Sequence, residues 1–152
     1  MGFDAAAGVA DLTTALAHLR ALPETAGHAC GVLGYCFGGT FAYALACHAD
    51  PAVAVSYYGS GVPSMLAQGS QISCPTLFHF GGRDPYIPAE EMAKVSAFVA
   101  DKPDMALHVQ DAGHAFDNTL HPMFANPAAQ ESAWQVTRSF LTEHLPVARA
   151  GE

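Results

Sequence analysis

The chain has 152 residues, of which 51% are hydrophobic, so it is long enough to bury one substantial core. Its 14 acidic and 6 basic residues give a net charge of −8, and no basic stripe exists, so we expect no nucleic-acid partner. The four cysteines form no C-x-x-C pair, and the sequence has neither a signal-peptide pattern nor an apolar run of membrane-spanning length. These features predict a cytoplasmic protein with free thiols and no membrane partner.

Helical and strand patterns alternate along the chain. Leucines at helical spacing predict a helix from Asp4 to Leu22, with Asp4 as its N-cap. Short apolar runs then predict four buried strands, with longer periodic runs between and after them. The strands are expected at 29–33, 53–58, 76–80 and 105–110, and the later helices at about 37–48, 89–100 and 128–145. Trp134 is expected to be buried, and residues 60–73 are expected to form a Gly/Ser-rich loop. This alternation implies one α/β domain over 1–152, with a parallel sheet of about four strands flanked by helices.

The segment G-Y-C-F-G-G over 34–39 lies between a predicted strand and a predicted helix. A sharp turn at this point forces its central residue into a strained backbone conformation and lifts the side chain above the carboxyl end of the sheet. Here that side chain is the thiol of Cys36. The helix start favours a thiolate, and the N–H of Phe37 would point at an oxyanion forming beside the sulfur. The alternative is a buried structural cysteine in a Gly-rich turn.

Two more polar residues follow predicted strands, Asp84 after the third and His114 after the fourth. Because functional groups gather at the carboxyl ends of parallel strands, we expect Cys36, Asp84 and His114 to lie together. In such a set the imidazole accepts the thiol proton and the carboxylate orients the imidazole. The chain order of nucleophile, acid and histidine is that of the α/β-hydrolase arrangement. Taken singly, Asp84 also fits a turn and His114 a loop.

Three segments together resemble the dienelactone hydrolase (carboxymethylenebutenolidase) family: the G-x-C-x-G-G turn, G-G-R-D-P-Y-I-P over 81–88, and G-H-A-F over 113–116. The resemblance covers nearly the whole chain, and the cysteine in the turn is its most discriminating part, since most relatives on this fold use serine. It implies an α/β-hydrolase fold that hydrolyses small esters and lactones through a triad of Cys36, His114 and Asp84, with no cofactor.

Two features depart from the family pattern. The family domain normally begins with several further strands, so we expect a sheet that lacks the N-terminal strands of the full fold and has strand 29–33 at its edge. An unpaired apolar strand readily pairs with another chain, which predicts a homodimer or higher oligomer joined there; the alternative is a monomer whose first helix covers the edge. Asn118 stands where the family carries an arginine that holds the substrate carboxylate, which argues against dienelactone itself.

The sequence leaves other functions open beside the thiol hydrolase. One alternative is a truncated, weakly active or inactive family member that acts as an assembly or binding module. Another is a redox-responsive thiol protein, because an activated Cys36 is oxidisable. No zinc-type spacing of Cys and His occurs in the sequence, so we expect no metal and interpret His79 and His108 as core or strand-end residues.

Overall fold

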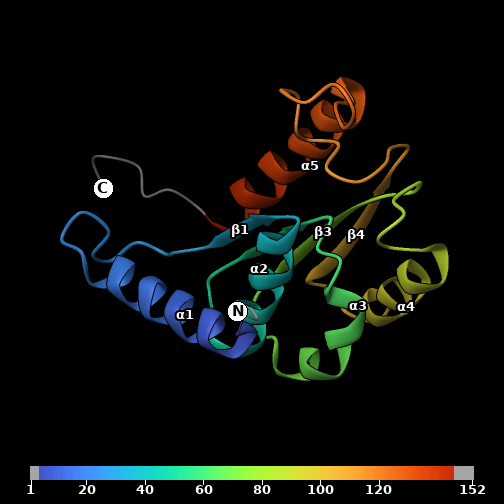
Figure 1. Cartoon of the computed structure of the whole chain (residues 1–152). Helices are drawn as coiled ribbons and strands as arrows, with labels where there is room; N and C mark the ends of the chain where they lie inside the picture. Colours follow the sequence, from blue (N-terminus) through green and yellow to red (C-terminus); the bar gives the residue numbers. More distant parts are fainter. Residues whose placement is uncertain (1–3, 146–152) are drawn as a thin grey trace.

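A parallel sheet of four strands, in the order β1-β2-β3-β4, forms the centre of the computed structural model, which describes residues 4–145 (Figure 1). In chain order the elements are α1 (Ala5–Ala21), β1 (Val32–Tyr35), α2 (Phe37–His48), β2 (Ala54–Tyr57), α3 (Val62–Met65), the 3-10 helix η1 (Leu66–Gln71), β3 (Thr76–Gly81), α4 (Ala89–Val99), β4 (Met105–Gln110) and α5 (Pro127–His144). The predicted α/β class, with about four parallel strands flanked by helices, is confirmed.

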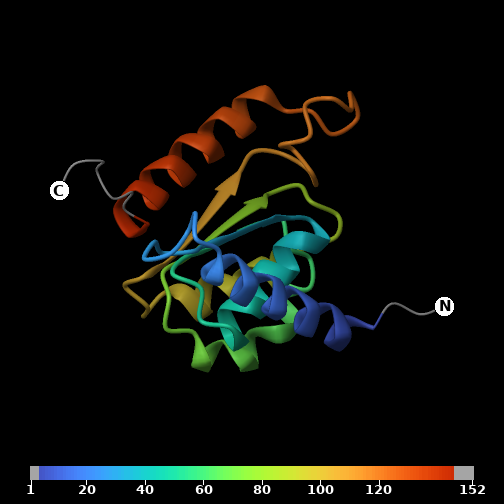
Figure 2. The ribbon, with the colours of Figure 1, turned by 90° about the vertical axis from the view of Figure 1, so that its left-hand side faces the viewer.

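The sheet is covered on both faces. Among the helices of residues 4–145, α5 lies on one face of the sheet and α1 to α4 lie on the other (Figures 1 and 2). Strands β2 and β3 are buried along their whole length, as the mainly apolar runs in their sequences predict. The core on the α2 and α4 side includes the fully buried side chains of Tyr43, Phe78 and Val95, and burying each such side chain is worth roughly 1.5–3 kcal/mol.

Side-chain caps explain where the two long outer helices begin. The carboxylate of Asp4 accepts hydrogen bonds from the amides of Ala6 and Ala7, as an N-cap does. The side chain of Asn126 accepts one from the amide of Ala129, and Pro127 occupies the first helical position. None of the helices described over 4–145 is long and apolar enough to cross a bilayer.

Three sequence-based expectations about local structure were wrong. The first strand begins at Val32 instead of residue 29, because its paired register with β2 starts at Val32, opposite Ala54. The Gly/Ser-rich segment 60–73 is not a plain loop, because α3 and η1 occupy most of it. Trp134 is 43% exposed, since α5 packs on the sheet through a different stripe. That stripe consists of the buried residues Ala129, Ala133 and Thr137.

A row of four rings crosses the sheet on the side that faces α5. Tyr35, Tyr57, His79 and His108 are in register across β1 to β4, with successive ring centroids 4.8, 4.6 and 5.8 Å apart. The hydroxyl of Thr137 on α5 lies 2.7 Å from the hydroxyl of Tyr57 and 3.0 Å from Nε2 of His79. His79 is a core residue, as predicted, and these hydrogen bonds join α5 to the middle of the row.

Strand β1 is an edge of the sheet. The amide of Val32 donates to the carbonyl oxygen of Val53, the residue that precedes β2. No other strand of the described residues pairs with the opposite side of β1. Leu33 is 39% exposed and Tyr35 is 41% exposed. The edge therefore presents apolar side chains together with backbone groups that face away from β2.

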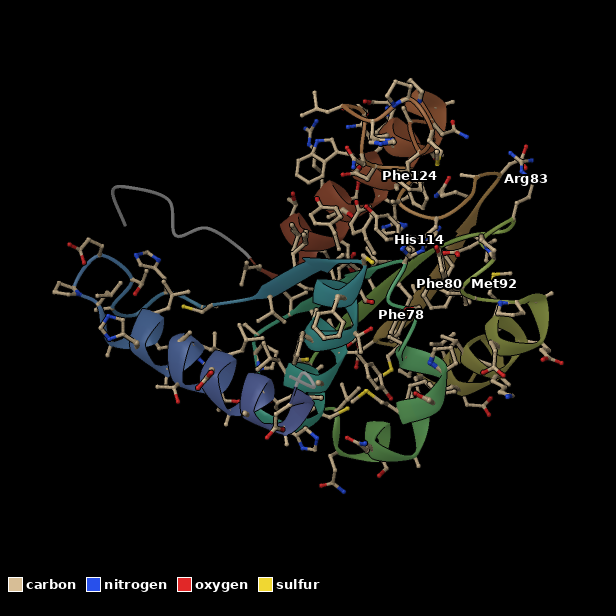
Figure 3. The ribbon with its side chains drawn as sticks, in the orientation of Figure 1. Phe78, Phe80, Arg83, Met92, His114 and Phe124 are labelled. Atoms are coloured by element: carbon tan, nitrogen blue, oxygen red, sulfur yellow. The ribbon has the colours of Figure 1, made fainter. Side chains whose placement is uncertain are left out.

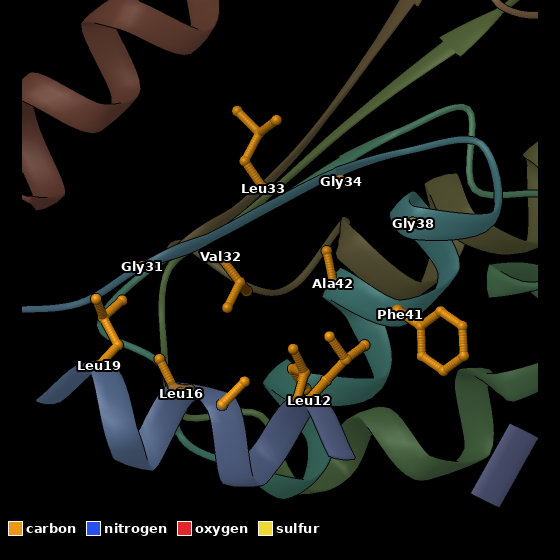
Figure 4. Close-up of a pocket in the computed structure, with 12 residues that line it drawn as sticks. Leu12, Leu16, Leu19, Gly31, Val32, Leu33, Gly34, Gly38, Phe41 and Ala42 are labelled. Atoms are coloured by element: carbon orange, nitrogen blue, oxygen red, sulfur yellow. The ribbon is translucent and has the colours of Figure 1, made fainter. Parts of the chain in front are cut away.

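Helix α1 packs beside this edge without pairing with it. Leu12, Leu16 and Leu19 face Val32 across an apolar cavity of about 370 Å³, while Leu33 points to the other side of the strand (Figure 4). The helix covers one face of the edge strand and leaves half-exposed apolar surface on the other.

Association through this edge stays a prediction. We expect the protein to sediment as a homodimer or higher oligomer at micromolar concentration, because an unblunted apolar edge strand pairs with a second chain. Leu33→Lys should shift the species toward monomer, since a charged side chain on an edge strand opposes pairing. Sedimentation velocity measures both.

The matched control is Leu120→Lys, which places the same charge on a side chain that is 95% exposed outside the sheet. It should leave the oligomeric state unchanged. A wild-type monomer whose β1 amides exchange slowly with solvent would contradict the exposed-edge argument.

The buried imidazole in the ring row makes stability depend on pH. Burial, and secondarily the nearby His108, lower the pKa of His79 from 6.5 to about 3. The unfolded chain therefore binds a proton at this residue below about pH 6.5. The folded chain binds that proton only below about pH 3. As the pH is lowered through that window, the free energy of unfolding should decrease. Between pH 7 and pH 5, this residue alone should lower it by about 2 kcal/mol.

Urea denaturation at the two pH values measures this loss. His79→Gln should show a decrease smaller by about 2 kcal/mol, because glutamine does not titrate there. His18→Gln, at an exposed position on α1, is the control and should behave like the wild type. An equal decrease in the wild type and in His79→Gln would show that His79 does not set the pH dependence.

Candidate active site

The turn between β1 and α2 depends on two glycines. Cys36 has φ 55° and ψ −116°, a conformation that L residues adopt rarely. A Cβ atom at Gly34 would lie 2.0 Å from the carbonyl oxygen of Gly38, and one at Gly39 would lie 2.5 Å from that of Tyr57. Gly38, in contrast, has open space around its own Cβ position. Close passage of strand and helix therefore requires Gly34 and Gly39.

Hydrogen bonds hold Cys36 in this conformation. Its amide donates to the carbonyl oxygen of Tyr57 at 2.9 Å, and its carbonyl oxygen accepts from the amides of Gly39 at 2.9 Å and Thr40 at 3.2 Å. The thiol is exposed and lies at the N-terminus of α2. The other three cysteines, Cys30, Cys47 and Cys74, are buried.

The loops that follow β3 and β4 are joined to each other through their backbones. The amide of Gly82 donates to the carbonyl oxygen of Gln110, and the amide of Arg83 donates to that of Ala112, both at 2.8 Å. These bonds continue the pairing of the two strands past their carboxyl ends. Asp84, in the first loop, and His114, in the second, are therefore carried side by side.

The structure brings all three of the predicted triad residues together. Nδ1–H of His114 donates to Oδ2 of Asp84 at 2.6 Å, and Nε2 of His114 lies 3.1 Å from Sγ of Cys36. The other oxygen of Asp84 accepts from the amide of Tyr86 at 2.8 Å. The Asp84 side chain is fully buried and that of His114 is 10% exposed. Figure 3 shows His114 near the middle of the molecule, with Arg83 of the same region projecting at its rim.

Two tyrosines hold the imidazole plane. The His114 ring contacts both Tyr58 and Tyr86, with centroids 5.1 and 4.9 Å away and edge-on geometry in both cases. Tyr58 and Ala115 also have positive φ angles, of 39° and 53°. Strained backbone thus surrounds the reactive groups on three segments, at a cost of about 1–3 kcal/mol each, which the surrounding contacts must offset.

A pocket of about 300 Å³ opens beside the thiol. It has room for a small organic molecule next to the sulfur. Its lining consists of Tyr35, Cys36, Tyr58, Ala115, Asp117 and Asn118.

Sequence reasoning missed three residues of this site. Tyr58 directly follows β2, so the strand-end rule that selected Asp84 and His114 could have found it. Tyr86 and Asp117 carry no comparable signal, because their positions depend on the course of the two loops. Phe37 is the first residue of α2, beside the thiol, and the role of its N–H stays a prediction.

The site offers nucleophilic chemistry through its own side chains. The thiol, the imidazole and the buried carboxylate lie in a row in space. The imidazole can take the proton from sulfur, and the carboxylate stabilises the imidazolium that forms. Over residues 4–145, no three His, Cys, Asp or Glu side chains are grouped so that they could hold a metal ion.

Comparison with known proteins gives a consistent result. The family model described as "Dienelactone hydrolase family" matches residues 3–145. The chain is similar to the carboxymethylenebutenolidase of Pseudomonas sp. strain P51, with 33% identity over 145 residues, 95% of this chain and 60% of that protein. It is also similar to the carboxymethylenebutenolidase of Pseudomonas putida, with 34% identity over 84% of this chain and 54% of that protein. The chain thus spans little more than half the length of these relatives.

Solved structures agree with these relatives. The fold is similar to that of a dienelactone hydrolase-like promiscuous phosphotriesterase from metagenomic libraries, with a TM-score of 0.80, 27% identity, and coverage of 93% of this chain and 63% of that one. A dienelactone hydrolase-type protein from Klebsiella pneumoniae, at 19% identity and a TM-score of 0.71, shares the fold over 89% of this chain and 62% of its own.

Proposed function

Because the chain belongs to the dienelactone hydrolase family, we propose that it hydrolyses small carboxylic esters or lactones with Cys36 as the nucleophile. The observation that carries the proposal is the unbroken contact from Asp84 through His114 to the thiol, at 2.6 and 3.1 Å. The names of the Pseudomonas relatives support a lactone or ester as the substrate class.

Acylation begins when Nε2 of His114 takes the thiol proton and the sulfur of Cys36 attacks the substrate carbonyl carbon. The carbonyl oxygen becomes an oxyanion, for which the amide N–H of Phe37 is the donor we propose. As the tetrahedral intermediate collapses, the C–O bond to the leaving alcohol breaks and His114 returns the proton to that oxygen. The acyl group is then held as a thioester on Cys36.

Deacylation repeats these steps with water. His114 takes a proton from a water molecule, whose oxygen attacks the thioester carbonyl, and the carbon–sulfur bond breaks. The thiolate takes the proton back from the imidazolium, so the enzyme is regenerated and the products are an acid and an alcohol. For a lactone, both products are ends of one hydroxy acid.

We propose that Asp84 orients the imidazole of His114 throughout this cycle. Its fully buried carboxylate accepts from Nδ1–H of His114, which leaves Nε2 facing the thiol. The second bond, from the amide of Tyr86, fixes the carboxylate itself. A charge held in place in this way stabilises the imidazolium at each proton transfer.

A second candidate function is an assembly or binding module with little or no activity. The observation that favours it is the exposed β1 edge, with its half-exposed Leu33 and Tyr35. This candidate predicts association without turnover, so ester hydrolysis separates the two.

Hydrolysis of p-nitrophenyl acetate, followed by absorbance, tests the proposal. His114→Ala should lower kcat/KM by on the order of 10²–10⁴-fold, the size typical of removing a general base. Cys36→Ala should lower it at least as far, because no acyl-enzyme can form. His18→Ala, at an exposed position on α1, removes an imidazole that does not line the pocket beside the thiol and should keep the wild-type rate.

Unchanged hydrolysis in both His114→Ala and Cys36→Ala would mean that the triad assignment is wrong. Circular dichroism of each variant confirms that the fold is retained, so that a loss of rate reports chemistry.

A further inference from the structure

The pocket beside the Cys36 thiol has an acidic component that the proposed mechanism does not use. Asp117 contributes to its lining together with Tyr35 and Tyr58. Asp117 follows His114 by three residues, so the loop that carries the imidazole also carries this charge to the pocket. A substrate that occupies this pocket with its carbonyl at the thiol would therefore share the pocket with this carboxylate.

The Asp117 carboxylate is unpartnered within the described part of the chain. No group of residues 4–145 forms a side-chain hydrogen bond or an ion pair with it. Burial raises its pKa above the ordinary value of an Asp side chain. A partly buried carboxylate without a partner is an unfavourable arrangement, which a cation from outside would relieve.

The carboxylate is close enough to act on the two phenols of the pocket. Burial, followed by the charge of Asp117, raises the pKa of Tyr35 and that of Tyr58 above the ordinary tyrosine value. Both rings therefore stay neutral near pH 7. Neutral aromatic rings beside a carboxylate attract an ammonium group by the ring quadrupole and by direct charge attraction.

No basic side chain of residues 4–145 contributes to the lining of this pocket, so the described site offers no lysine or arginine to an anionic substituent. The described basic residues instead make contacts elsewhere or lie on α5. Arg20 donates to the carbonyls of Ala49 and Asp50, Arg83 pairs with Asp111, Lys94 pairs with Glu91, Lys102 lies 4.1 Å over the Phe98 ring, and Arg138 is on the surface of α5.

We propose that this pocket binds the cationic substituent of an ammonium-bearing ester or lactone, with Asp117 as the residue that determines this specificity. The inference rests on the proposed hydrolase function and names its substrate class. Esters that carry a carboxylate in the same place are disfavoured, because Asp117 repels them and no described lysine or arginine of the pocket compensates.

Labelling of Cys36 tests the pocket without requiring turnover. Three methanethiosulfonates carry a trimethylammonium, a neutral or a sulfonate group on the same short arm. In each reaction the Cys36 thiolate attacks the sulfenyl sulfur, a disulfide forms and methanesulfinate leaves. The rates at Cys36 are measured by peptide mass mapping near pH 7.5 and divided by the rates with free glutathione.

The ratio of cationic to anionic labelling should be lowered about tenfold by Asp117→Asn, the size expected for one partly screened charge contact. Asp117→Glu retains the charge and should retain most of the ratio. Asp101→Asn is the matched control, because it removes an exposed carboxylate outside the pocket and corrects for the net charge of −8. Equal ratios in the wild type, Asp117→Asn and Asp101→Asn would overturn the inference.

Ester hydrolysis provides the second readout. Acetylcholine and its neutral isostere 3,3-dimethylbutyl acetate have nearly the same shape, so their kcat/KM ratio isolates the charge. The wild type should prefer acetylcholine by about fivefold or more, and Asp117→Asn should remove this preference. Equal rates on the two esters in the wild type would overturn the substrate class.

The two readouts separate this inference from the proposed function. Charge-selective labelling without hydrolysis of either ester or of p-nitrophenyl acetate would contradict the hydrolase function and support the cation-binding pocket. Hydrolysis that depends on Cys36 with no charge selectivity in either assay would support the hydrolase and overturn the role of Asp117.

Discussion

Backbone packing at the turn between β1 and α2 fixes where the thiol lies, and the rest of the site depends on it. At Gly34 a single added carbon would lie 2.0 Å from the carbonyl oxygen of Gly38, so any other residue there forces α2 away from β1. The bond from the amide of Cys36 to the carbonyl of Tyr57 then joins the turn to β2. The positive φ of Cys36 is maintained by these contacts and directs its side chain away from the core.

The other two reactive groups meet the thiol because parallel strands end at one edge of the sheet. Gly81 at the end of β3 lies so close to the next loop that a Cβ there would be 2.4 Å from the carbonyl oxygen of Gly113. Asp84 and His114 are therefore carried on loops that are joined to each other at the end of the sheet. Burial of Asp84 and the rings of Tyr58 and Tyr86 then leave the imidazole few other orientations.

The sequence alone predicts the parts of this structure that local chemistry determines. The mainly apolar runs predicted buried parallel strands, and the glycines at 34 and 39 predicted a close turn around Cys36. Features that depend on how elements pair were not accessible. The row from Tyr35 to His108 appears only once the register is known, and the outward position of Trp134 depends on which face of α5 meets the sheet. The position of Asp117 beside the thiol was not predictable either, because three separate segments of the chain form the pocket that it lines.

In the proposed mechanism, the sulfur of Cys36 carries the acyl group during ester hydrolysis. The most direct test mixes the protein with p-nitrophenyl acetate, quenches with acid within the first turnovers and maps acetylated peptides by mass spectrometry. We expect an acetyl group on Cys36 that hydroxylamine removes, as it does a thioester, and that decays more slowly in His114→Ala. Turnover by the wild type with no acetyl group on Cys36, or with the acetyl group on another residue, would show that Cys36 is not the nucleophile.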